Sequence, residues 1–204
     1  MFEVVLDHRD FVMVNKTAAV SFHAEQGPGL FVNIEQHLGQ KLWPVHRLDK
    51  VTTGLLLLAK SAEAAAIFGD AFANRKISKC YLALSDRKPA KKQGWIKGDM
   101  AKARRGAWRL LRSTEHPAIT RFDSQSLAPG QRLFRLWPQT GRTHQLRVAM
   151  KSLGAPILGD SLYGGSNWPR VCLHAYALAF DWQGDNIAIS QPADFSELAP
   201  PPFE

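Results

Sequence analysis

Residues 44–59 read PVHRLDKVTTGLLLLA, a polar turn followed directly by an apolar run. Residues 54–59 are short, continuous and apolar, which is typical of a β-strand buried on both faces. Asp49 lies in the polar turn ahead of that strand, between Arg47 and Lys50. A carboxylate with cationic neighbours stays ionised and can serve as a nucleophile or a general base. Taken alone, the motif still favours a simpler interpretation, in which Asp49 caps the turn and Arg47 is a surface residue.

The rest of the chain alternates short strand patterns with a few helix patterns. Gly39 ends one helix, Ser61 is a good N-cap for another, and Pro129-Gly130 joins two strands as a turn. Strands are expected at residues 2–6, 11–14, 54–59, 80–84, 119–127, 132–137 and 171–180, and helices at residues 30–39, 62–74 and 144–153. Strands with scattered helices and hairpin signals predict an α+β fold with a mixed, mostly antiparallel sheet.

A second polar segment, GRTHQLR at residues 141–147, leads from a turn into the helix expected at residues 144–153. Donors at a helix start suit contact with an anion, and Arg142 and Arg147 could pair with Asp49 or with phosphate. The helix should carry an apolar stripe, with Arg147 on a different face. A polar helix face with a structural salt bridge is the alternative interpretation.

Two further segments give weaker signals. Tyr81 follows Lys79-Cys80 in an apolar strand pattern, where a tyrosine is usually a core residue. Residues 154–165, GAPILGDSLYGG, form a turn-rich connector that includes Asp160 and Tyr163. A purely structural role is expected for this connector.

The charge of the chain is concentrated in one place. The 204 residues are 45% hydrophobic and 22% charged, so the chain can bury a sizeable core as one domain. The net charge is +8, and residues 87–112 (the basic segment) hold ten Lys or Arg against one acid, Asp99. Trp95 and Trp108 lie in the same segment, and basic side chains mixed with aromatic ones suit phosphate neutralisation and base stacking. The segment is predicted to be an RNA-contacting loop or hairpin, with a solvated basic loop as the alternative.

The sequence lacks the signals of several other classes. Cys80 and Cys172 show no ligand spacing, so no zinc framework is expected. The charged N-terminus is not a signal peptide, and the longest apolar run, residues 55–59, is far shorter than the ~20 residues that span a membrane. No GxGxxG, GxxxxGK[ST] or GxSxG motif is present. A cytoplasmic protein is expected, and its size suits a monomer.

These segments, in this order, resemble the RluA-type pseudouridine synthases, which modify ribosomal and transfer RNA. The family's HRLD segment, with its Thr-Gly turn and apolar strand, corresponds to residues 46–60. Its GRTHQ[IL]RVH segment corresponds to residues 141–149, with Ala149 where the family often has His. Its G-x-P-I-x-G-D-x-x-Y-G segment corresponds to residues 154–164. Asn15-Lys16-Thr17 matches an Asn-Lys-Pro segment whose proline is absent here. The resemblance covers nearly the whole chain.

The resemblance implies a mechanism and a set of site residues. Asp49 corresponds to the family's essential nucleophile, Tyr81 to its active-site tyrosine, and Arg147 to an arginine beside the nucleophile. The reaction breaks the N1–C1′ glycosidic bond of uridine, turns the base and rejoins it through C5. It is redox-neutral, so no cofactor and no metal ion is expected. A single catalytic domain over residues 1–204 is implied, without an N-terminal S4-like domain and with an irregular tail from about residue 190.

RNA is the implied partner, as an rRNA or tRNA stem-loop. A uridine inside a helix cannot be turned over, so the target base must leave the stack. RNA-binding residues are expected in the two polar motifs and in the basic segment: His46, Arg47, Lys50, Arg142, His144, Lys91, Lys92, Lys97, Arg104 and Arg105.

Two alternatives stay open on the sequence. One is an RNA-binding module of the same fold without activity, and the presence of Asp49, Tyr81 and Arg147 counts against it. The other is a metal-dependent nuclease, which would need several convergent carboxylates. The aspartates of the chain show no such spacing.

Overall fold

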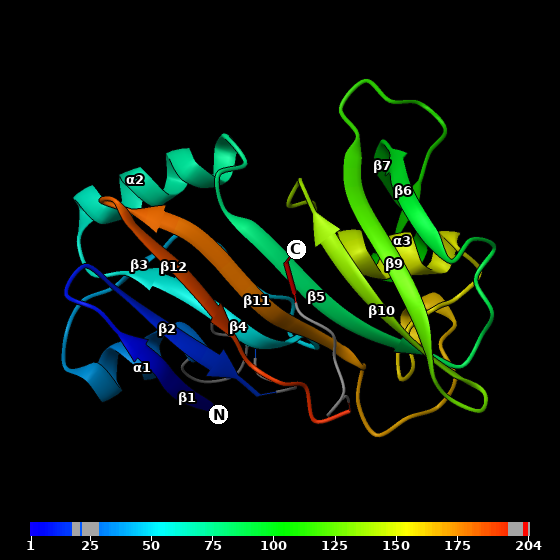
Figure 1. Ribbon diagram of the computed structural model, residues 1–204, viewed down its shortest axis with the longest axis horizontal. Helices are drawn as coiled ribbons and strands as arrows, with labels where there is room; N and C mark the ends of the chain where they lie inside the picture. The colour runs from blue at the N-terminus through cyan, green and yellow to red at the C-terminus, as the bar shows by residue number, and fades with distance from the viewer. Residues whose placement is uncertain (18–20, 22–28, 196–201, 204) are drawn as a thin grey trace. The chain divides into compact units, whose positions relative to one another are not determined.

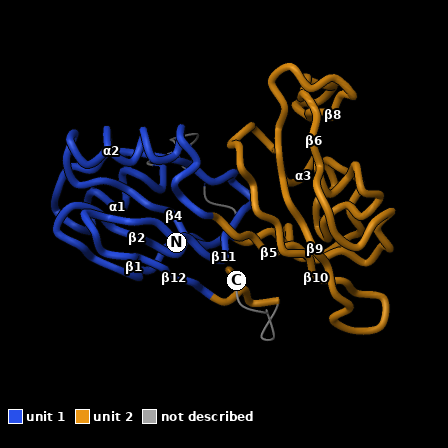
Figure 2. Tube along the Cα trace, turned by 45° about the horizontal axis from the view of Figure 1, so that its top comes forward, with its two compact units in different colours: residues 1–78, 175–191 blue, residues 79–174, 192–204 orange. Residues whose placement is uncertain are grey.

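The computed structural model describes residues 1–17, 21, 29–195 and 202–203. The chain divides into two compact units (Figure 2). Unit 1 comprises residues 1–78 and 175–191, and unit 2 comprises residues 79–174 and 192–204. Within the described residues, the strands form a mixed, mostly antiparallel ten-stranded sheet, which three α-helices accompany (Figure 1). The predicted α+β class is confirmed.

Unit 1 contributes six strands to the sheet and two helices. In spatial order the main strands are β1 (Phe2–Asp7), β2 (Phe11–Lys16), β4 (Thr53–Ala59) and β11 (Leu173–Trp182). The short strand β3 (Trp43–Pro44) pairs with β4, and β12 (Asp185–Ser190) pairs with β11. The helices are α1 (Leu30–Leu38) and α2 (Ala62–Ala73). Strands β3 and β12 were not predicted, because neither carries a strong apolar pattern of its own.

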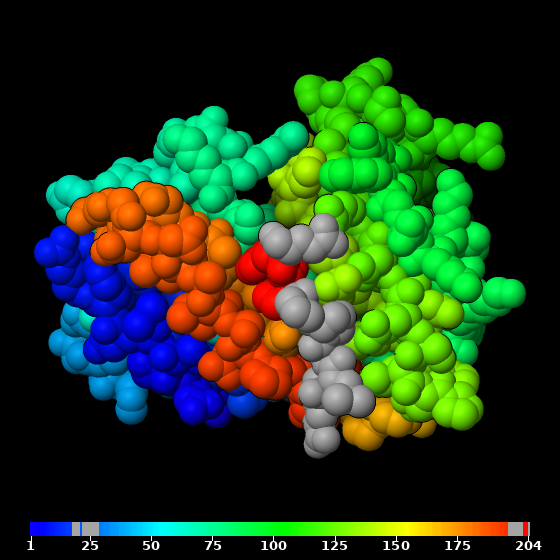
Figure 3. Space-filling model, in the orientation of Figure 1, coloured from blue at the N-terminus to red at the C-terminus, as the bar shows by residue number. Residues whose placement is uncertain are grey.

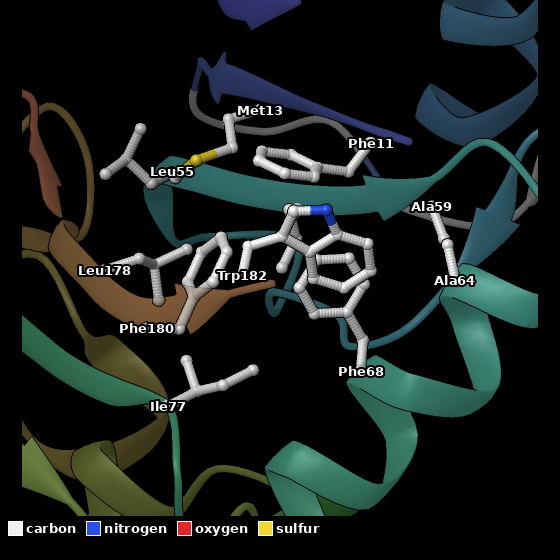
Figure 4. Packing of buried hydrophobic residues seen from close by; sticks show 11 residues of the cluster. Phe11, Met13, Leu55, Ala59, Ala64, Phe68, Ile77, Leu178, Phe180 and Trp182 are labelled. Atoms are coloured by element: carbon white, nitrogen blue, oxygen red, sulfur yellow. The ribbon is translucent and has the colours of Figure 1, made fainter. Parts of the chain in front are cut away.

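Strand β4 is the centre of unit 1, since all seven of its residues are buried. One face of β4, with Leu55 and Leu57, packs in a cluster with Phe68 of α2 and Trp182 of β11 (Figure 4). The rings of Phe68 and Trp182 stack with centroids 4.4 Å apart. Leu56 and Leu58 point to the opposite face and are also fully buried. The prediction of a strand buried on both faces is confirmed.

The helix boundaries in unit 1 follow local chemistry. Ser61 is the N-cap of α2, and its Oγ accepts a hydrogen bond from the backbone N–H of Ala64 at 3.0 Å. Gly39 ends α1 in the left-handed conformation with φ of 64°, a region that costs a residue with a Cβ about 1–2 kcal/mol. Both predicted boundaries are confirmed.

Unit 2 contributes four strands in the order β5 (Ser78–Ser85), β10 (Gln131–Pro138), β9 (Ala118–Ala128) and β6 (Gln93–Gly98). The predicted hairpin through Pro129-Gly130 is β9–β10. Gly94 lies inside β6, the strand at the edge of the sheet. An edge strand tolerates a glycine, since only one of its sides is paired.

A small separate hairpin follows β6. It consists of β7 (Met100–Lys102), a 3-10 turn η1 (Arg104–Gly106) and β8 (Trp108–Leu110), and it is called the basic hairpin below. Its neighbour is α3 (Gln145–Ser152), and a second 3-10 turn η2 (Ser161–Tyr163) lies in the connector after α3.

Helix α3 differs from its predicted pattern. An apolar stripe with Arg147 on another face was expected, whereas residues 145–150 are all buried. Arg147 is only 6% exposed. The helix is therefore enclosed on several sides, which a polar residue tolerates only with a partner.

The tail after β12 has no regular element over residues 191–195 apart from an isolated bridge at Ala193. Residues 196–201 and 204, part of the predicted irregular tail, lie outside the described residues. In the described part of the chain, no helix has the length and apolar character needed to cross a membrane.

Gly54 provides a test of the unit 1 packing. Its φ is 104°, and a Cβ placed there would lie 2.3 Å from the backbone oxygen of Ala175. We expect Gly54→Ala to lower the free energy of unfolding by about 3 kcal/mol or more, because backbone must shift to admit the methyl group. Urea unfolding at equilibrium measures this loss.

Gly130→Ala is the matched control. Gly130 also has a positive φ, 73°, but no atom lies within 4 Å of the added Cβ. Only backbone strain of about 1 kcal/mol is expected there. Equal losses in the two variants would contradict the close approach at Gly54.

Candidate active site

The HRLD turn lies directly ahead of β4 in unit 1. The backbone N–H of Thr52 donates to the carbonyl of Asp49 at 3.0 Å, which closes the turn. Leu48 is buried and anchors the turn, whereas Arg47 and Lys50 are exposed. Asp49 is half-buried between them. The carboxylate-bearing residue therefore sits on a short turn attached to the most buried strand of unit 1.

His46 fastens the start of this turn to the sheet. Its Nε2 accepts a hydrogen bond from the backbone N–H of Leu57 at 2.8 Å, and its ring lies 5.0 Å from that of Phe72. A ring nitrogen that accepts a hydrogen bond carries no hydrogen, so this contact assigns the neutral tautomer with the proton on Nδ1. His46 was predicted to bind RNA, and the contacts described for it lie within unit 1.

Lys16, the last residue of β2, supports this turn, and its role was not predicted from the sequence. Its Nζ donates to the carbonyls of Thr52 at 2.7 Å, Lys50 at 2.9 Å and Thr17 at 3.2 Å. The residue is 1% exposed. Burial lowers the pKa of the Lys16 ammonium to about 8, while the negative charge of Asp49 acts in the opposite direction. A buried cation thus holds the backbone of the turn that carries Asp49.

The signal for Lys16 was weak in the sequence. A lysine at the end of an apolar strand is normally read as an exposed residue that ends the strand. Only the match of Asn15-Lys16-Thr17 to a family segment drew attention to it.

In unit 2, Tyr81 lies on β5, half-buried. It is paired with Leu136 on β10, which is in turn paired with Phe122 on β9. Directly paired residues of antiparallel strands share a sheet face, and so do residues two apart on one strand. Thr120 of β9 therefore lies on the same face as Tyr81.

Gln145 fixes the start of α3 on that face. Its Nε2 donates to Thr120 Oγ1 at 3.0 Å and to the carbonyl of Ile119 at 3.1 Å. Its Oε1 accepts from Thr140 Oγ1 at 2.8 Å and from the backbone N–H of Arg142 at 3.0 Å. The side-chain amide therefore has its full set of partners, and the GRTHQLR turn is pinned to β9.

Arg147 forms a buried bidentate ion pair. Its Nε and Nη2 donate to the two carboxylate oxygens of Asp160, each at 2.8 Å. The side chains of Arg147 and Asp160 are 7% and 1% exposed. Such geometry orients the guanidinium plane as well as compensating its burial.

Tyr163 lies under the same guanidinium. The Cζ of Arg147 is 4.9 Å from the centre of the Tyr163 ring, within cation–π range. The hydroxyl of Tyr163 is 2.8 Å from Nδ1 of His144, and it accepts the backbone N–H of Trp108 at 3.0 Å. The connector, for which a purely structural role was expected, therefore supplies two residues that contact the arginine of the predicted site.

The basic segment has two parts in the structure. One part includes β6, where Trp95 is 50% exposed and the Lys97 ammonium lies 5.2 Å from its ring centre. The other is the basic hairpin, whose residues stand at the surface of unit 2 among the green atoms of the space-filling view (Figure 3). The exposed cations predicted to bind RNA in unit 2 are Lys91, Lys92, Lys97, Arg104, Arg105 and Arg142.

The predicted site residues are distributed over both units. Asp49 belongs to unit 1, and Tyr81 and Arg147 belong to unit 2. Within unit 2, Tyr81 and the start of α3 lie on one face of the sheet. Among the residues that the structure describes, no group of three or more His, Cys, Asp or Glu is arranged to hold a metal ion.

A solved human structure shares this architecture. Human RNA pseudouridylate synthase domain containing 1 superposes with a TM-score of 0.80 and 26% identity, over 96% of this chain and 84% of that chain. The fold is thus that of a pseudouridine synthase domain. The family profile described as RNA pseudouridylate synthase matches residues 10–152, and the chain belongs to this family, in its RluA-type branch. It is a pseudouridine synthase, an isomerase that acts on RNA.

Two relatives are similar in sequence over most of this chain. An uncharacterized RNA pseudouridine synthase of Haemophilus influenzae is 55% identical over 92% of this chain and 86% of its own length. Ribosomal large subunit pseudouridine synthase C of Rickettsia bellii is 31% identical over 92% of this chain and 64% of its own length. The family resemblance predicted from the motifs is confirmed.

The lowered pKa of Lys16 predicts a pH-dependent stability. The folded chain releases this proton above pH of about 8, whereas the unfolded chain keeps it up to the ordinary value of 10.5. Unfolding therefore takes up a proton between these values, so raising the pH opposes unfolding. We expect the stability of the wild type, relative to Lys16→Met, to rise between pH 8 and 10.

Urea unfolding of both proteins at several pH values measures this difference. Lys41→Met, which removes an exposed lysine of unit 1, is the control and should show no such change. A wild-type advantage that is constant or falls with rising pH would contradict the assignment.

The buried ion pair predicts a difference between two aspartates. Asp160→Ala leaves a buried guanidinium without its carboxylate and should cost about 3–5 kcal/mol of unfolding free energy. Asp123→Ala breaks the ion pair between Asp123 and Arg135, whose side chains are 31% and 17% exposed, respectively. This loss should cost about 1 kcal/mol or less. Thermal or urea unfolding checks both, and similar losses would contradict the structural role of Asp160.

Proposed function

We propose that the protein converts a specific uridine in structured rRNA or tRNA into pseudouridine, with Asp49 as the nucleophile. The observation that carries this proposal is the HRLD turn, where Asp49 is held by backbone contacts at the start of the most buried strand. The name of the Rickettsia bellii relative supports a ribosomal target, and tRNA is the other target class considered.

The chemistry places a precise demand on Asp49. The N1–C1′ bond of the uridine breaks and a C5–C1′ bond forms, while a proton leaves C5 and N1 gains one. The carboxylate must be ionised to attack or to assist the elimination. The negative charge of Asp49 raises the pKa of Lys16 against the larger effect of burial, so the buried ammonium and the carboxylate interact electrostatically.

Tyr81 and Arg147 have supporting roles in the proposal. Tyr81 packs on the target base and assists proton removal late in the reaction. Arg147 supplies the cation that the family resemblance implies for the site. Its bidentate contact with Asp160 and the ring of Tyr163 beneath it hold the guanidinium in one orientation before substrate binds. The proposal therefore requires residues of both units.

The RNA contacts follow from exposure and charge. The basic segment carries the excess positive charge of the chain, and its cations named above are exposed. They neutralise phosphates of a stem-loop, while the target uridine leaves the stack. Arg47 is exposed next to Asp49 and is suited to hold the phosphates near the extruded base.

Substitution of the nucleophile tests this function. We expect Asp49→Asn and Asp49→Ala to fold normally and bind RNA, and to lose all detectable turnover, because neither side chain can act as a carboxylate. Pseudouridine mapping of total RNA would compare wild-type cells, cells lacking the gene, and cells rescued with each variant.

Asp185→Asn is the matched control, because Asp185 is an exposed aspartate of unit 1 away from the turn. It should restore the modification fully. Restoration by Asp49→Asn would remove Asp49 from the mechanism. The identity of the restored site decides between rRNA and tRNA.

A further inference from the structure

The basic hairpin presents positive charge at an exposed turn. Arg104 and Arg105 are exposed at its tip, and Arg105 has a φ of 57°. Asp99 precedes the hairpin, but its carboxylate accepts the backbone N–H groups of Glu115 and His116 at 3.1 and 2.8 Å. The acid of the basic segment is thus used to close the base of the hairpin, and the tip keeps its positive charge.

The hairpin is attached to the predicted site through the side chain of Tyr163. The backbone N–H of Trp108, at the start of β8, donates to the hydroxyl of Tyr163 at 3.0 Å. Tyr163 is 2% exposed and lies in the connector after α3. A backbone hydrogen bond to a buried, rigid ring couples the position of β8 to that of the ring.

The same hydroxyl also contacts the N-cap residue of α3. Because a backbone N–H can only donate, the hydroxyl is the acceptor toward Trp108. The hydroxyl also lies 2.8 Å from Nδ1 of His144, within hydrogen-bond distance. The hydroxyl of Tyr163 therefore joins the hairpin and the start of α3 through two hydrogen bonds.

The ring of Tyr163 supports Arg147 at the same time. The guanidinium lies over the ring, and its carboxylate partner Asp160 is three residues earlier in the same connector. The backbone N–H of Tyr163 donates to the carbonyl of Asp160 at 3.1 Å. A shift of Tyr163 must therefore disturb both partners that orient Arg147.

We propose that Tyr163 is a positioning residue that couples RNA contact at the basic hairpin to the orientation of Arg147. This proposal rests on the proposed function, in which the hairpin binds RNA and Arg147 acts at the site. Binding of phosphates at Arg104 and Arg105 holds β8, and β8 holds the Tyr163 hydroxyl. The enzyme thereby favours its productive arrangement when a structured RNA is engaged.

Tyr163→Phe separates this role from simple packing. The phenylalanine keeps the ring beneath Arg147, but it removes the hydroxyl that accepts from Trp108 and contacts Nδ1 of His144. Tyr176→Phe is the matched control, because Tyr176 is a buried tyrosine of unit 1 outside the contacts described here. Circular dichroism and urea unfolding confirm that each variant is folded under assay conditions.

The first experiment is a kinetic double-mutant cycle. It compares wild type, Tyr163→Phe, the charge variant Arg104→Ala/Arg105→Ala, and the combination, on unmodified transcripts of large-subunit rRNA and of tRNA. In the wild-type background, the charge variant should lower kcat as well as raise KM and flatten the salt dependence. In the Tyr163→Phe background, kcat should already be lower by about tenfold, and the charge variant should raise KM only.

The second experiment does not depend on turnover. Hydrogen exchange of backbone amides is measured with and without the same transcripts, in the wild type and in Tyr163→Phe. In the wild type, RNA should slow exchange in the hairpin at residues 100–110 and in α3 at residues 145–152. In Tyr163→Phe, RNA should protect the hairpin but leave α3 close to its exchange in the free protein.

The outcomes separate the two proposals. Equal protection of α3 in both proteins, additive effects on kcat, or absence of hairpin protection by RNA overturns the coupling through Tyr163. A wild type that protects its hairpin and α3 but produces no pseudouridine in any transcript contradicts the proposed function, while the exchange data still decide the coupling. Tyr176→Phe should behave as the wild type in both experiments. If it lowered kcat and the protection of α3 as much as Tyr163→Phe does, the effect of Tyr163→Phe would reflect the general loss of a buried hydroxyl.

Discussion

A guanidinium buried as deeply as that of Arg147 must have its charge and its N–H groups compensated within the protein, and this requirement shapes the turns around α3 in unit 2. Asp160 supplies the partner with two 2.8 Å contacts, so the connector after α3 has to fold back onto the helix. That return brings Tyr163 under the guanidinium and onto His144. Gln145 fixes the other side of the same turn to β9. The site in unit 2 is thus a consequence of one buried charge and its compensation.

Unit 1 meets the same constraint with a different solution. Lys16 is buried without a carboxylate in direct contact among the bonds described for it, and three backbone carbonyls receive its ammonium. The carbonyls belong to the strand end and to the turn that carries Asp49. A cation held by backbone oxygens shapes that turn more firmly than an exposed ion pair would, because water competes less for buried donors. In both units, a buried cation is part of the predicted site: Lys16 binds the backbone of the turn that carries Asp49, and Arg147 is oriented by Asp160.

The remaining cations of the chain serve a different purpose. Those of the basic segment are exposed, and exposed cations gain little from ion pairs within the protein. They gain more from contact with a polyanion, because binding releases counterions from its phosphates. The affinity of such binding depends on the salt concentration. The division between buried, oriented cations and exposed ones fits an enzyme that must both bind RNA and orient the residues of its site. Tyr163 contacts both the basic hairpin, through the backbone N–H of Trp108, and the guanidinium of Arg147.

The sequence by itself determined the features that local rules control: β4 as a strand buried on both faces, α2 with its cap at Ser61, and the family through its motifs. It did not reveal the burial of Arg147, the carbonyl groups that bind Lys16 or the hydrogen bond from Trp108 to Tyr163. Lys16 and Lys50 are 34 residues apart, and Trp108 and Tyr163 are 55 apart. Periodicity and capping act within one or two turns of chain, whereas a buried polar group is satisfied by whichever segment the fold brings to it. Only the tertiary structure therefore decided which polar residues became the supports of the site.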